Sequence, residues 1–323
     1  MLQRPRRNRS SAVIRSMVEE TRLSAKDMLF PLFVMEGKNV STEIKSMPGI
    51  YRYSTDLLLK EIESCVNLGI QSFALFPQIA ESKKDSTASE SHKKGSLYLE
   101  SIYEVSKRFP EISLLTDVAM DPYSSDGHDG IVQGGQILND ETLPILAKMA
   151  IAQAQAGSKL IGPSDMMDGR IGYLRESLDD AGFSNVGIMA YTAKYASAFY
   201  GPFRDALESA PKFGDKKTYQ MNPANRREAL IELELDESEG ADFLMVKPAL
   251  AYLDVIAAVR QLVNVPVAAY HVSGEYSMIK AAAANGWIDH DIVATEHLTA
   301  IKRAGADIIL TYLARWYGEL TNG

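Results

Sequence analysis

The sequence predicts an α/β fold, a (β/α)8 TIM barrel in residues 26–323, preceded by an extended N-terminal arm in residues 1–25. Three observations lead to this prediction. Short apolar runs recur along the chain, amphipathic segments lie between them, and glycines mark several junctions between a helix and the next strand. Eight such strand–helix units match a barrel, which takes roughly 250 residues plus insertions.

Apolar runs bounded by Gly and Pro are typical of the buried strands of a parallel sheet. The eight predicted strands are 28–34, 72–76, 113–119, 158–162, 187–191, 243–247, 266–270 and 306–312. The alternative is a doubly wound open sheet. That fold would carry a Gly-rich phosphate-binding turn after its first strand, and the residues after Val34 contain no such turn.

Amphipathic segments supply the predicted helices between these strands. Examples are 57–68, 143–156 and 293–304. Helices often end at a glycine, because glycine adopts the left-handed conformation at low cost. Four glycines stand in this position just before a predicted strand: Gly69, Gly157, Gly240 and Gly305.

Composition excludes several classes of protein. Hydrophobic residues are 46% of the 323 residues and charged residues 24%, as in an ordinary globular protein. The net charge of −8 argues against nucleic acid as a partner. No apolar run approaches the roughly 18 residues of a membrane span, so we expect no membrane partner and a cytoplasmic location. Cys65 is the only cysteine, which excludes an internal disulfide and any multi-cysteine zinc site.

The first 17 residues differ from the rest, since they carry five arginines and no acidic residue. This segment could be a transit peptide, an arm that binds nucleic acid, or an extension that packs on another subunit. We favour the packing arm and do not exclude targeting to an organelle.

Two lysines stand at the ends of neighbouring predicted strands. Lys247 closes the apolar run 243–246 and directly precedes Pro248, and Lys194 follows the preceding predicted strand. Burial lowers the pKa of a lysine, and a neutral amine can attack a ketone to form a Schiff base. Neighbouring strands lie about 4.8 Å apart, so each amine would also lower the pKa of the other. Two lysines that reach solvent from separate loops are the alternative.

The end of the third predicted strand and the loop after it, residues 117–130, form an acidic loop. It contains Asp117, Asp121, Asp126, His128 and Asp129. Hard oxygen ligands suit magnesium. The alternative is a turn that is rich in Asp, Gly and Pro because turns generally are.

Other strand ends and one long connection add candidate polar groups. Ser273 follows the seventh strand and Tyr312 ends the eighth, and both carry hydroxyls suited to a carboxylate. The segment from Tyr195 to Glu239 is longer than an ordinary connection and is a candidate lid. Its cations could bind an anionic substrate, or they could simply be solvated.

The residues alone leave three interpretations. A Schiff-base aldolase explains one lysine but not two on consecutive strands. A metal-dependent hydrolase explains the aspartates but needs histidines that the other strand ends lack. A barrel without catalytic activity leaves both lysines unexplained.

Four motifs carry a resemblance to a known family. LMVKPALAYLD, YTAKYASAFYGPFRDA, GPSDMMDGR and YHVSGEYSMIKAA together resemble porphobilinogen synthase, also called 5-aminolevulinate dehydratase. The resemblance runs from about residue 4 to the end of the chain. It implies a barrel enzyme that condenses two 5-aminolevulinate molecules into porphobilinogen in tetrapyrrole biosynthesis, with loss of two waters and without an organic cofactor.

The resemblance also implies roles for individual residues. Lys247 and Lys194 match the two Schiff-base lysines of the family. Residues that match its substrate-binding positions are Arg204, Lys216, Gln220, Tyr270, Ser273 and Tyr312. Family members often have arginine where this chain has Lys216, which keeps the charge but not the two-pronged hydrogen bonding.

The acidic loop departs from the zinc-dependent members, which place three cysteines there. This chain has Ala119, Asp121 and Asp129 at those positions, so it resembles the aspartate-rich, magnesium-dependent branch and no zinc is expected. The aspartates, with Asp117, would then act in acid–base chemistry or bind magnesium weakly.

The family also suggests an assembly and a second magnesium site. Glu232 matches the position of an allosteric magnesium ion, with Ser164 and Asp165 nearby across a subunit boundary. Members are commonly homo-octamers in which the arm of one subunit wraps a neighbouring barrel.

Overall fold

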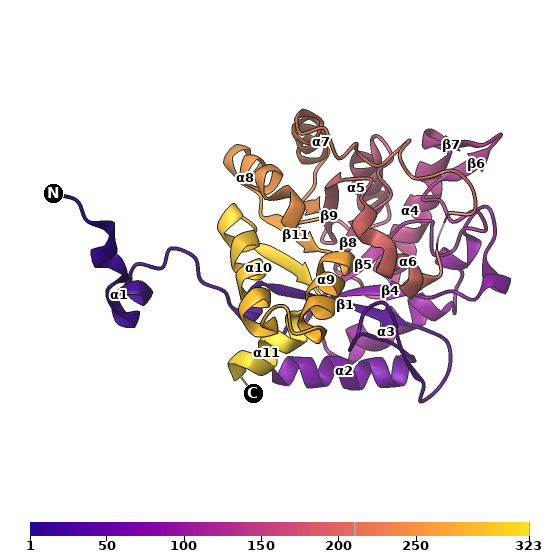
Figure 1. Cartoon of the computed structure of the whole chain (residues 1–323). Coiled ribbons are helices and arrows are strands. Elements are labelled where there is room, and N and C mark those ends of the chain that lie inside the picture. Colours follow the sequence, from indigo (N-terminus) through magenta and orange to yellow (C-terminus); the bar gives the residue numbers. More distant parts are fainter. Residues whose placement is uncertain (210, 323) are drawn as a thin grey trace.

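Eight parallel strands close into a barrel in this computed structural model, which describes residues 1–209 and 211–322 (Figure 1). The strands are β1 (Met28–Val34), β4 (Ser72–Pro77), β5 (Ser113–Val118), β8 (Leu160–Pro163), β9 (Gly187–Lys194), β10 (Phe243–Lys247), β11 (Val267–His271) and β12 (Ile308–Thr311). Each strand pairs with the next, and β12 pairs with β1 to close the ring. The predicted TIM barrel is confirmed, with all eight strands within a few residues of their predicted bounds.

Helices surround the ring of strands. They are α2 (Thr55–Asn67), α3 (Leu97–Arg108), α4 (Asn139–Gln155), α5 (Arg170–Asp180), α7 (Arg227–Ser238), α8 (Leu253–Leu262), α9 (Ser273–Ala284), α10 (His290–Ala304) and α11 (Ala314–Asn322). The apolar runs become strands because the ring buries them on both faces: all seven residues of β1 are buried.

The four glycines that were predicted to end helices all have positive φ angles. Gly305 shows why the position requires glycine. Its φ is +120°, and a Cβ there would lie 2.7 Å from the Arg260 side chain. A larger residue would be strained in backbone conformation and would also collide with α8.

Two small hairpins were not predicted. Strands β2 (Ser41–Glu43) and β3 (Tyr51–Tyr53) pair with each other, and β3 also pairs with β1. Strands β6 (Ile131–Gln133) and β7 (Gln136–Leu138) form a separate hairpin after the acidic loop. These strands are only three residues long and none of their residues is buried, so they lack the apolar run that marks the barrel strands.

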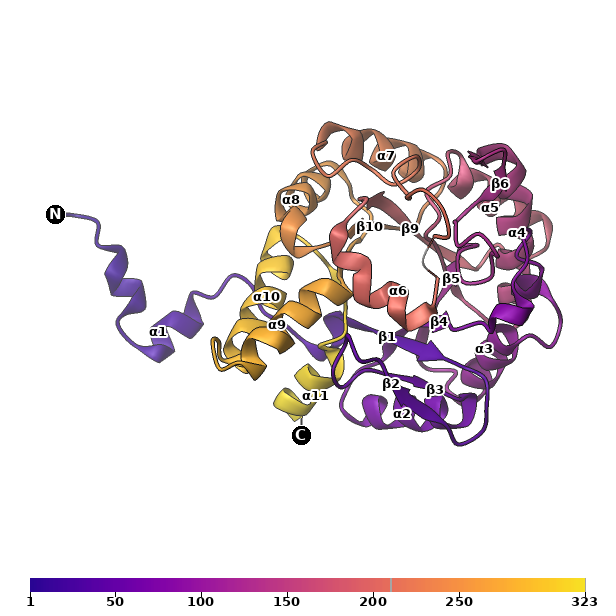
Figure 2. The same cartoon turned by 45° about the vertical axis from the view of Figure 1, so that its right-hand side comes forward.

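The long segment between β9 and β10 divides into two parts. Its second part is α7, an ordinary helix of the outer ring, so the prediction of one insertion from Tyr195 to Glu239 was too long. Its first part contains α6 (Gly201–Leu207), which lies across the centre of the ring of strands in Figure 2. α6 therefore covers the end of the barrel at which β9 and β10 place their lysines.

The N-terminal arm extends away from the barrel in both views (Figures 1 and 2). It contains α1 (Ala12–Met17), and no residue from 1 to 22 is buried. Leu23 packs partly against the core and Ala25 is buried, so packing on the barrel begins within the last residues of the predicted arm. Among the described residues, no helix combines the length and the apolar character needed to cross a bilayer.

Deletion of residues 1–20 should leave the barrel folded, because the deleted segment contributes no buried side chain to it. We expect the near-UV circular dichroism and the cooperativity of thermal unfolding to match those of the full chain. Loss of the near-UV signal would show that the arm is part of the barrel's own folding unit.

Candidate active site

Lys194 and Lys247 are the last residues of β9 and β10, and they are partners in the register of the two strands. Both side chains are only 6% exposed. Because the carboxyl ends of parallel strands meet at one end of a barrel, the two amines belong to the same interior space.

Aromatic rings surround the Lys247 amine. Its Nζ lies 4.5 Å from the ring centre of Tyr270, 5.1 Å from those of Tyr191 and Phe203, and 5.2 Å from that of Tyr200. These rings remove water from the amine but present their negative faces to a cation. They can therefore accommodate a nitrogen that is neutral in one state and positive in another.

Burial and, after it, the neighbouring Lys194 ammonium lower the pKa of Lys247 to about 7. The carboxylates of Asp117, Asp121 and Asp129 oppose this shift. A substantial fraction of the amine is therefore neutral near pH 7, as nucleophilic attack on a ketone requires.

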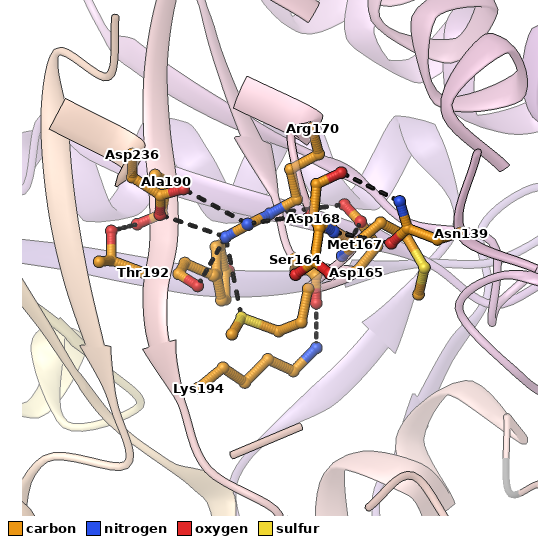
Figure 3. A network of polar contacts seen from close by, with 12 residues as sticks. Asn139, Ser164, Asp165, Met167, Asp168, Arg170, Ala190, Thr192, Lys194 and Asp236 are labelled. Carbon is orange, nitrogen blue, oxygen red and sulfur yellow. Dashed lines mark hydrogen bonds and ion pairs between the residues drawn. The ribbon is translucent and has the colours of Figure 1, made fainter. Parts of the chain in front are cut away.

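Lys194 lies on the polar side of the site. Its Nζ donates a hydrogen bond to the carbonyl oxygen of Ser164, which follows β8 (Figure 3). The Ser164 hydroxyl in turn donates to Asp117 Oδ1 at 2.7 Å. Ser164 therefore connects Lys194 to a carboxyl group, a role that the sequence analysis did not assign to it.

The acidic loop supplies three buried carboxyl groups with different proton affinities. Burial and the nearby Asp121 carboxylate raise the pKa of Asp117 to about 7. Burial and Asp129 likewise raise the pKa of Asp121. Burial would also raise the pKa of Asp129, but the Lys216 and Lys194 ammonium groups outweigh it and lower that pKa. Such a separation suits an acid and a base that act together.

Lys216 holds two of these carboxylates. Its Nζ lies 3.1 Å from Asp121 Oδ2 and 2.9 Å from Asp129 Oδ2, and all three side chains are largely buried. These carboxylates raise the pKa of Lys216 although burial alone would lower it. The ammonium thus occupies the position between the carboxylates that a bound cation would need.

The loop does not fit a metal site. Within residues 1–209 and 211–322, no three His, Cys, Asp or Glu side chains are arranged to hold a metal ion. Asp121 and Asp129 face Lys216, and Asp117 accepts the Ser164 hydrogen bond. Of the two alternatives for these aspartates, the arrangement favours acid–base chemistry over weak magnesium binding.

Asp126 and His128 lie in the same loop, but their contacts are with the part of the candidate lid that follows α6. The Asp126 carbonyl accepts the backbone N–H of Lys212 at 3.0 Å. The buried His128 ring contacts the Tyr219 hydroxyl and the Phe213 carbonyl oxygen, both at 3.1 Å. They join the acidic loop to the segment that follows α6.

The hydroxyl groups lie on the Lys247 side. The Tyr270 and Tyr312 hydroxyls are 3.0 Å apart. Ser273 Oγ accepts the backbone N–H of Phe203 at 3.0 Å and donates to the Phe199 carbonyl oxygen at 3.3 Å. Ser273 therefore contacts the candidate lid. Tyr312 lies beside Tyr270, one of the aromatic rings around the Lys247 amine.

Two further predicted substrate-binding residues lie in the segment between β9 and α7. Gln220 is buried, and its Oε1 has no hydrogen-bond partner among the described residues. Arg204 lies half-buried on α6.

Glu232 lies outside this cluster, half-buried on α7. Burial raises the pKa of Glu232 to about 7; Asp236, Asp168 and Glu228 add to the shift, and Arg170 opposes it. Glu232 therefore lies in an acidic region in which Arg170 supplies opposing positive charge.

Arg170 connects α7 with the end of β8 inside one chain (Figure 3). Its side chain is 2% exposed, lies 3.3 Å from Asp236 and 4.0 Å from Asp165, and donates to the Tyr191 carbonyl oxygen at 3.1 Å. Ser164 and Asp165 are both buried, and Ser164 contacts Lys194.

Sequence reasoning missed the rings of Tyr191, Tyr200 and Phe203. The available signal was the aromatic cluster in 199–203 together with a tyrosine three residues before Lys194. The closure of α6 over the barrel brings Tyr200 and Phe203 to Lys247, whereas Tyr191 reaches it from the neighbouring strand β9.

Lys194→Met should raise the pKa of Lys247, because it removes the neighbouring positive charge and keeps the side-chain length. We expect the pH midpoint for borohydride trapping of a ketone on Lys247 to move upward. Lys217→Met, which alters an exposed lysine, is the matched control. An unchanged midpoint in Lys194→Met would show that burial alone lowers the pKa.

Comparisons with known proteins agree with this geometry. The family model described as delta-aminolevulinic acid dehydratase matches residues 2–320. Delta-aminolevulinic acid dehydratase of Chlamydia pneumoniae is 52% identical over 317 residues, 98% of this chain and 96% of the relative. The chloroplastic delta-aminolevulinic acid dehydratase 1 of Arabidopsis thaliana is 54% identical over 313 residues, 96% of this chain and 73% of the relative.

A solved structure gives the same result. Delta-aminolevulinic acid dehydratase (porphobilinogen synthase) from Toxoplasma gondii ME49, in complex with the reaction product porphobilinogen, superposes with a TM-score of 0.97. It is 48% identical, and the match covers 99% of this chain and 92% of that one. The chain belongs to the delta-aminolevulinic acid dehydratase (porphobilinogen synthase) family.

Proposed function

We propose that this chain, a hydro-lyase of tetrapyrrole biosynthesis, joins its two 5-aminolevulinate molecules through Schiff bases on Lys247 and Lys194. The overall reaction is the asymmetric condensation of two 5-aminolevulinate molecules into porphobilinogen with loss of two waters. The observation that carries the two-lysine route is the register pairing of two buried lysines at the same end of β9 and β10.

Each Schiff base would form by the same steps. The neutral lysine nitrogen attacks the ketone carbon, giving a carbinolamine, and the carbinolamine loses water when its hydroxyl is protonated. Asp117 is suited to give and take this proton, because its pKa is raised to about 7. Asp129, whose pKa is lowered, stays negative and can stabilise the iminium charge.

The substrate carboxylates would bind at two places. On the Lys247 side, the hydroxyls of Ser273 and Tyr312 can donate hydrogen bonds, and Tyr270 supports Tyr312. On the other side, Arg204 and Lys216 supply positive charge, with Gln220 beside them. Lys216 would then exchange part of its contact with Asp121 and Asp129 for the substrate carboxylate.

The closing of α6 would exclude water from both amines. Phe203 belongs to α6, packs over Lys247, and donates its backbone N–H to Ser273 Oγ. A substrate carboxylate that engages Ser273 would therefore act at the point where the lid is attached. This arrangement supports a lid that responds to substrate.

We also propose that this chain belongs to the magnesium-dependent branch, with an allosteric Mg²⁺ at Glu232. The support is the carboxyl groups around Glu232, whose charge a hard divalent cation would offset. No three such side chains converge there within the described part of the chain, so Glu232 would be a single carboxylate ligand. Bound there, the ion would neutralise charge on α7. No catalytic step depends on it.

The expected assembly is a homo-octamer in which the arm packs on a neighbouring barrel. Its support is the arm itself, which buries no residue between 1 and 22 within its own chain and exposes Val13 and Met17. Sedimentation of the variant lacking residues 1–20 tests this, and an assembly of unchanged subunit number would contradict it. The cytoplasmic location stays a prediction, since some relatives are chloroplastic and others bacterial.

Lys247→Ala should abolish formation of porphobilinogen, and Lys194→Ala should reduce it severely, because orienting two reactants is worth roughly 7–11 kcal/mol of barrier. A colorimetric assay with 5-aminolevulinate measures the loss, and circular dichroism checks the fold. Lys159→Ala, an exposed lysine before β8, is the control. More than trace activity in Lys247→Ala would contradict the two-lysine route.

A zinc-selective chelator should leave activity unchanged, because the acidic loop presents carboxylates and an ammonium where zinc would need thiolate or imidazole.

Glu232→Gln should remove the stimulation by added Mg²⁺ while leaving the basal rate near that of the wild type. Activity assays with the zinc-selective chelator and over a magnesium titration check both expectations. Inactivation that only zinc reverses would contradict the proposed branch.

A further inference from the structure

Glu275 is a buried carboxylate that the chemistry proposed above does not use. It lies in the first turn of α9 and is 1% exposed. Its Oε1 accepts the backbone N–H of Leu250 at 2.7 Å, and its Oε2 accepts that of Val272 at 2.7 Å. One side chain thus connects two segments that follow different strands.

Backbone amides supply the main counter-charge for Glu275. Burial raises the pKa of Glu275 to about 7, and the amides of Val272, Leu250, Ala251 and Ala249 oppose that shift. Hydrogen bonds from N–H groups to a carboxylate are short and strong, and the first turn of a helix favours a negative charge. The contact therefore restrains the segments around Leu250 and Val272 more than an uncharged side chain in the same position would.

The two segments carry groups of the active site. Residues 248–252 follow Lys247 directly, and Val272 directly precedes Ser273. The other side of the Lys247 backbone is also held, since its carbonyl oxygen accepts from the Tyr195 N–H at 2.9 Å and the Tyr200 hydroxyl at 3.2 Å. Glu275 supplies the restraint on the side that faces α9.

The start of α9 also abuts the lid. A Cβ on Gly274 would lie 2.6 Å from the Phe199 carbonyl oxygen, so the two backbones are in direct contact. Ser273 contacts the same lid segment through its hydroxyl. The loop after Lys247, the N-terminus of α9 and the lid therefore meet around Glu275.

We propose that Glu275 is a positioning residue that sets the spacing between the Lys247 amine and the Ser273 hydroxyl, and so aligns a ketone bound at one with its carboxylate bound at the other. This inference rests on the roles proposed above for Lys247 and Ser273. Glu275 touches neither substrate nor reacting atoms and acts only through the two backbones.

The test compares Glu275→Gln and Glu275→Asp with Asp242→Asn. Gln replaces one acceptor oxygen by a donor that faces an N–H group, and Asp keeps both oxygens on a side chain one methylene shorter. Asp242 is the matched control, because it lies just before the other end of β10, where its Oδ2 accepts the Ile188 N–H at 2.7 Å. Stability is measured by thermal unfolding, and all rates are taken well below each midpoint.

The decisive readout is borohydride trapping on Lys247 with two ketones. Levulinate carries a carboxylate at the distance of the substrate's own, and 2-hexanone is an uncharged ketone of similar length. We expect Glu275→Gln to slow trapping of levulinate relative to 2-hexanone and to lower kcat for 5-aminolevulinate by about 10²-fold, the effect of a displacement near 1 Å. Glu275→Asp should fall between wild type and Gln, and Asp242→Asn should lose stability without changing the ratio.

Three outcomes separate the possibilities. An unchanged levulinate-to-hexanone ratio in a folded Glu275 variant overturns the inference, even if that variant is less stable. If Glu275→Gln does not fold, a wild-type ratio and kcat in Glu275→Asp overturn it equally. Mass spectrometry that finds the wild-type label on a residue other than Lys247 would instead refute the proposed function.

Discussion

The register between β9 and β10 is the constraint on which the site depends. It places Lys194 and Lys247 side by side at the end of two buried strands, where neither amine reaches bulk water. Burial and mutual repulsion then lower the pKa of the Lys247 amine to about 7, so that a substantial fraction of it is neutral at pH 7. A shift of that register by one residue would turn one lysine out of the barrel interior and remove both effects.

The two amines nevertheless occupy different environments. Lys247 lies among aromatic rings, whereas Lys194 contacts a backbone carbonyl and lies close to a serine and an aspartate. An enzyme that joins two copies of one substrate asymmetrically must treat the copies differently. The division into an aromatic side and a polar side provides a physical basis for that difference.

Lys216 determines how the acidic loop behaves. Two buried carboxylates close together would normally repel, and the Lys216 ammonium between Asp121 and Asp129 compensates for that repulsion. Asp117 lies outside this ion pair and has a raised pKa. An internal cation thus allows one loop to hold a carboxylate that stays charged and another that can exchange a proton near pH 7.

The sequence by itself determined the barrel, its eight strands and the identity of the two lysines, because strand periodicity, glycine positions and family motifs are local signals. It did not reveal that α7 is an ordinary barrel helix, that Tyr191, Tyr200 and Phe203 surround Lys247, or that Lys216 pairs with Asp121 and Asp129. These contacts join residues from different connections of the barrel, and no spacing along the chain encodes them. Only the packing of α6 across the strand ends decided which side chains share the dry interior, and therefore which pKa values change.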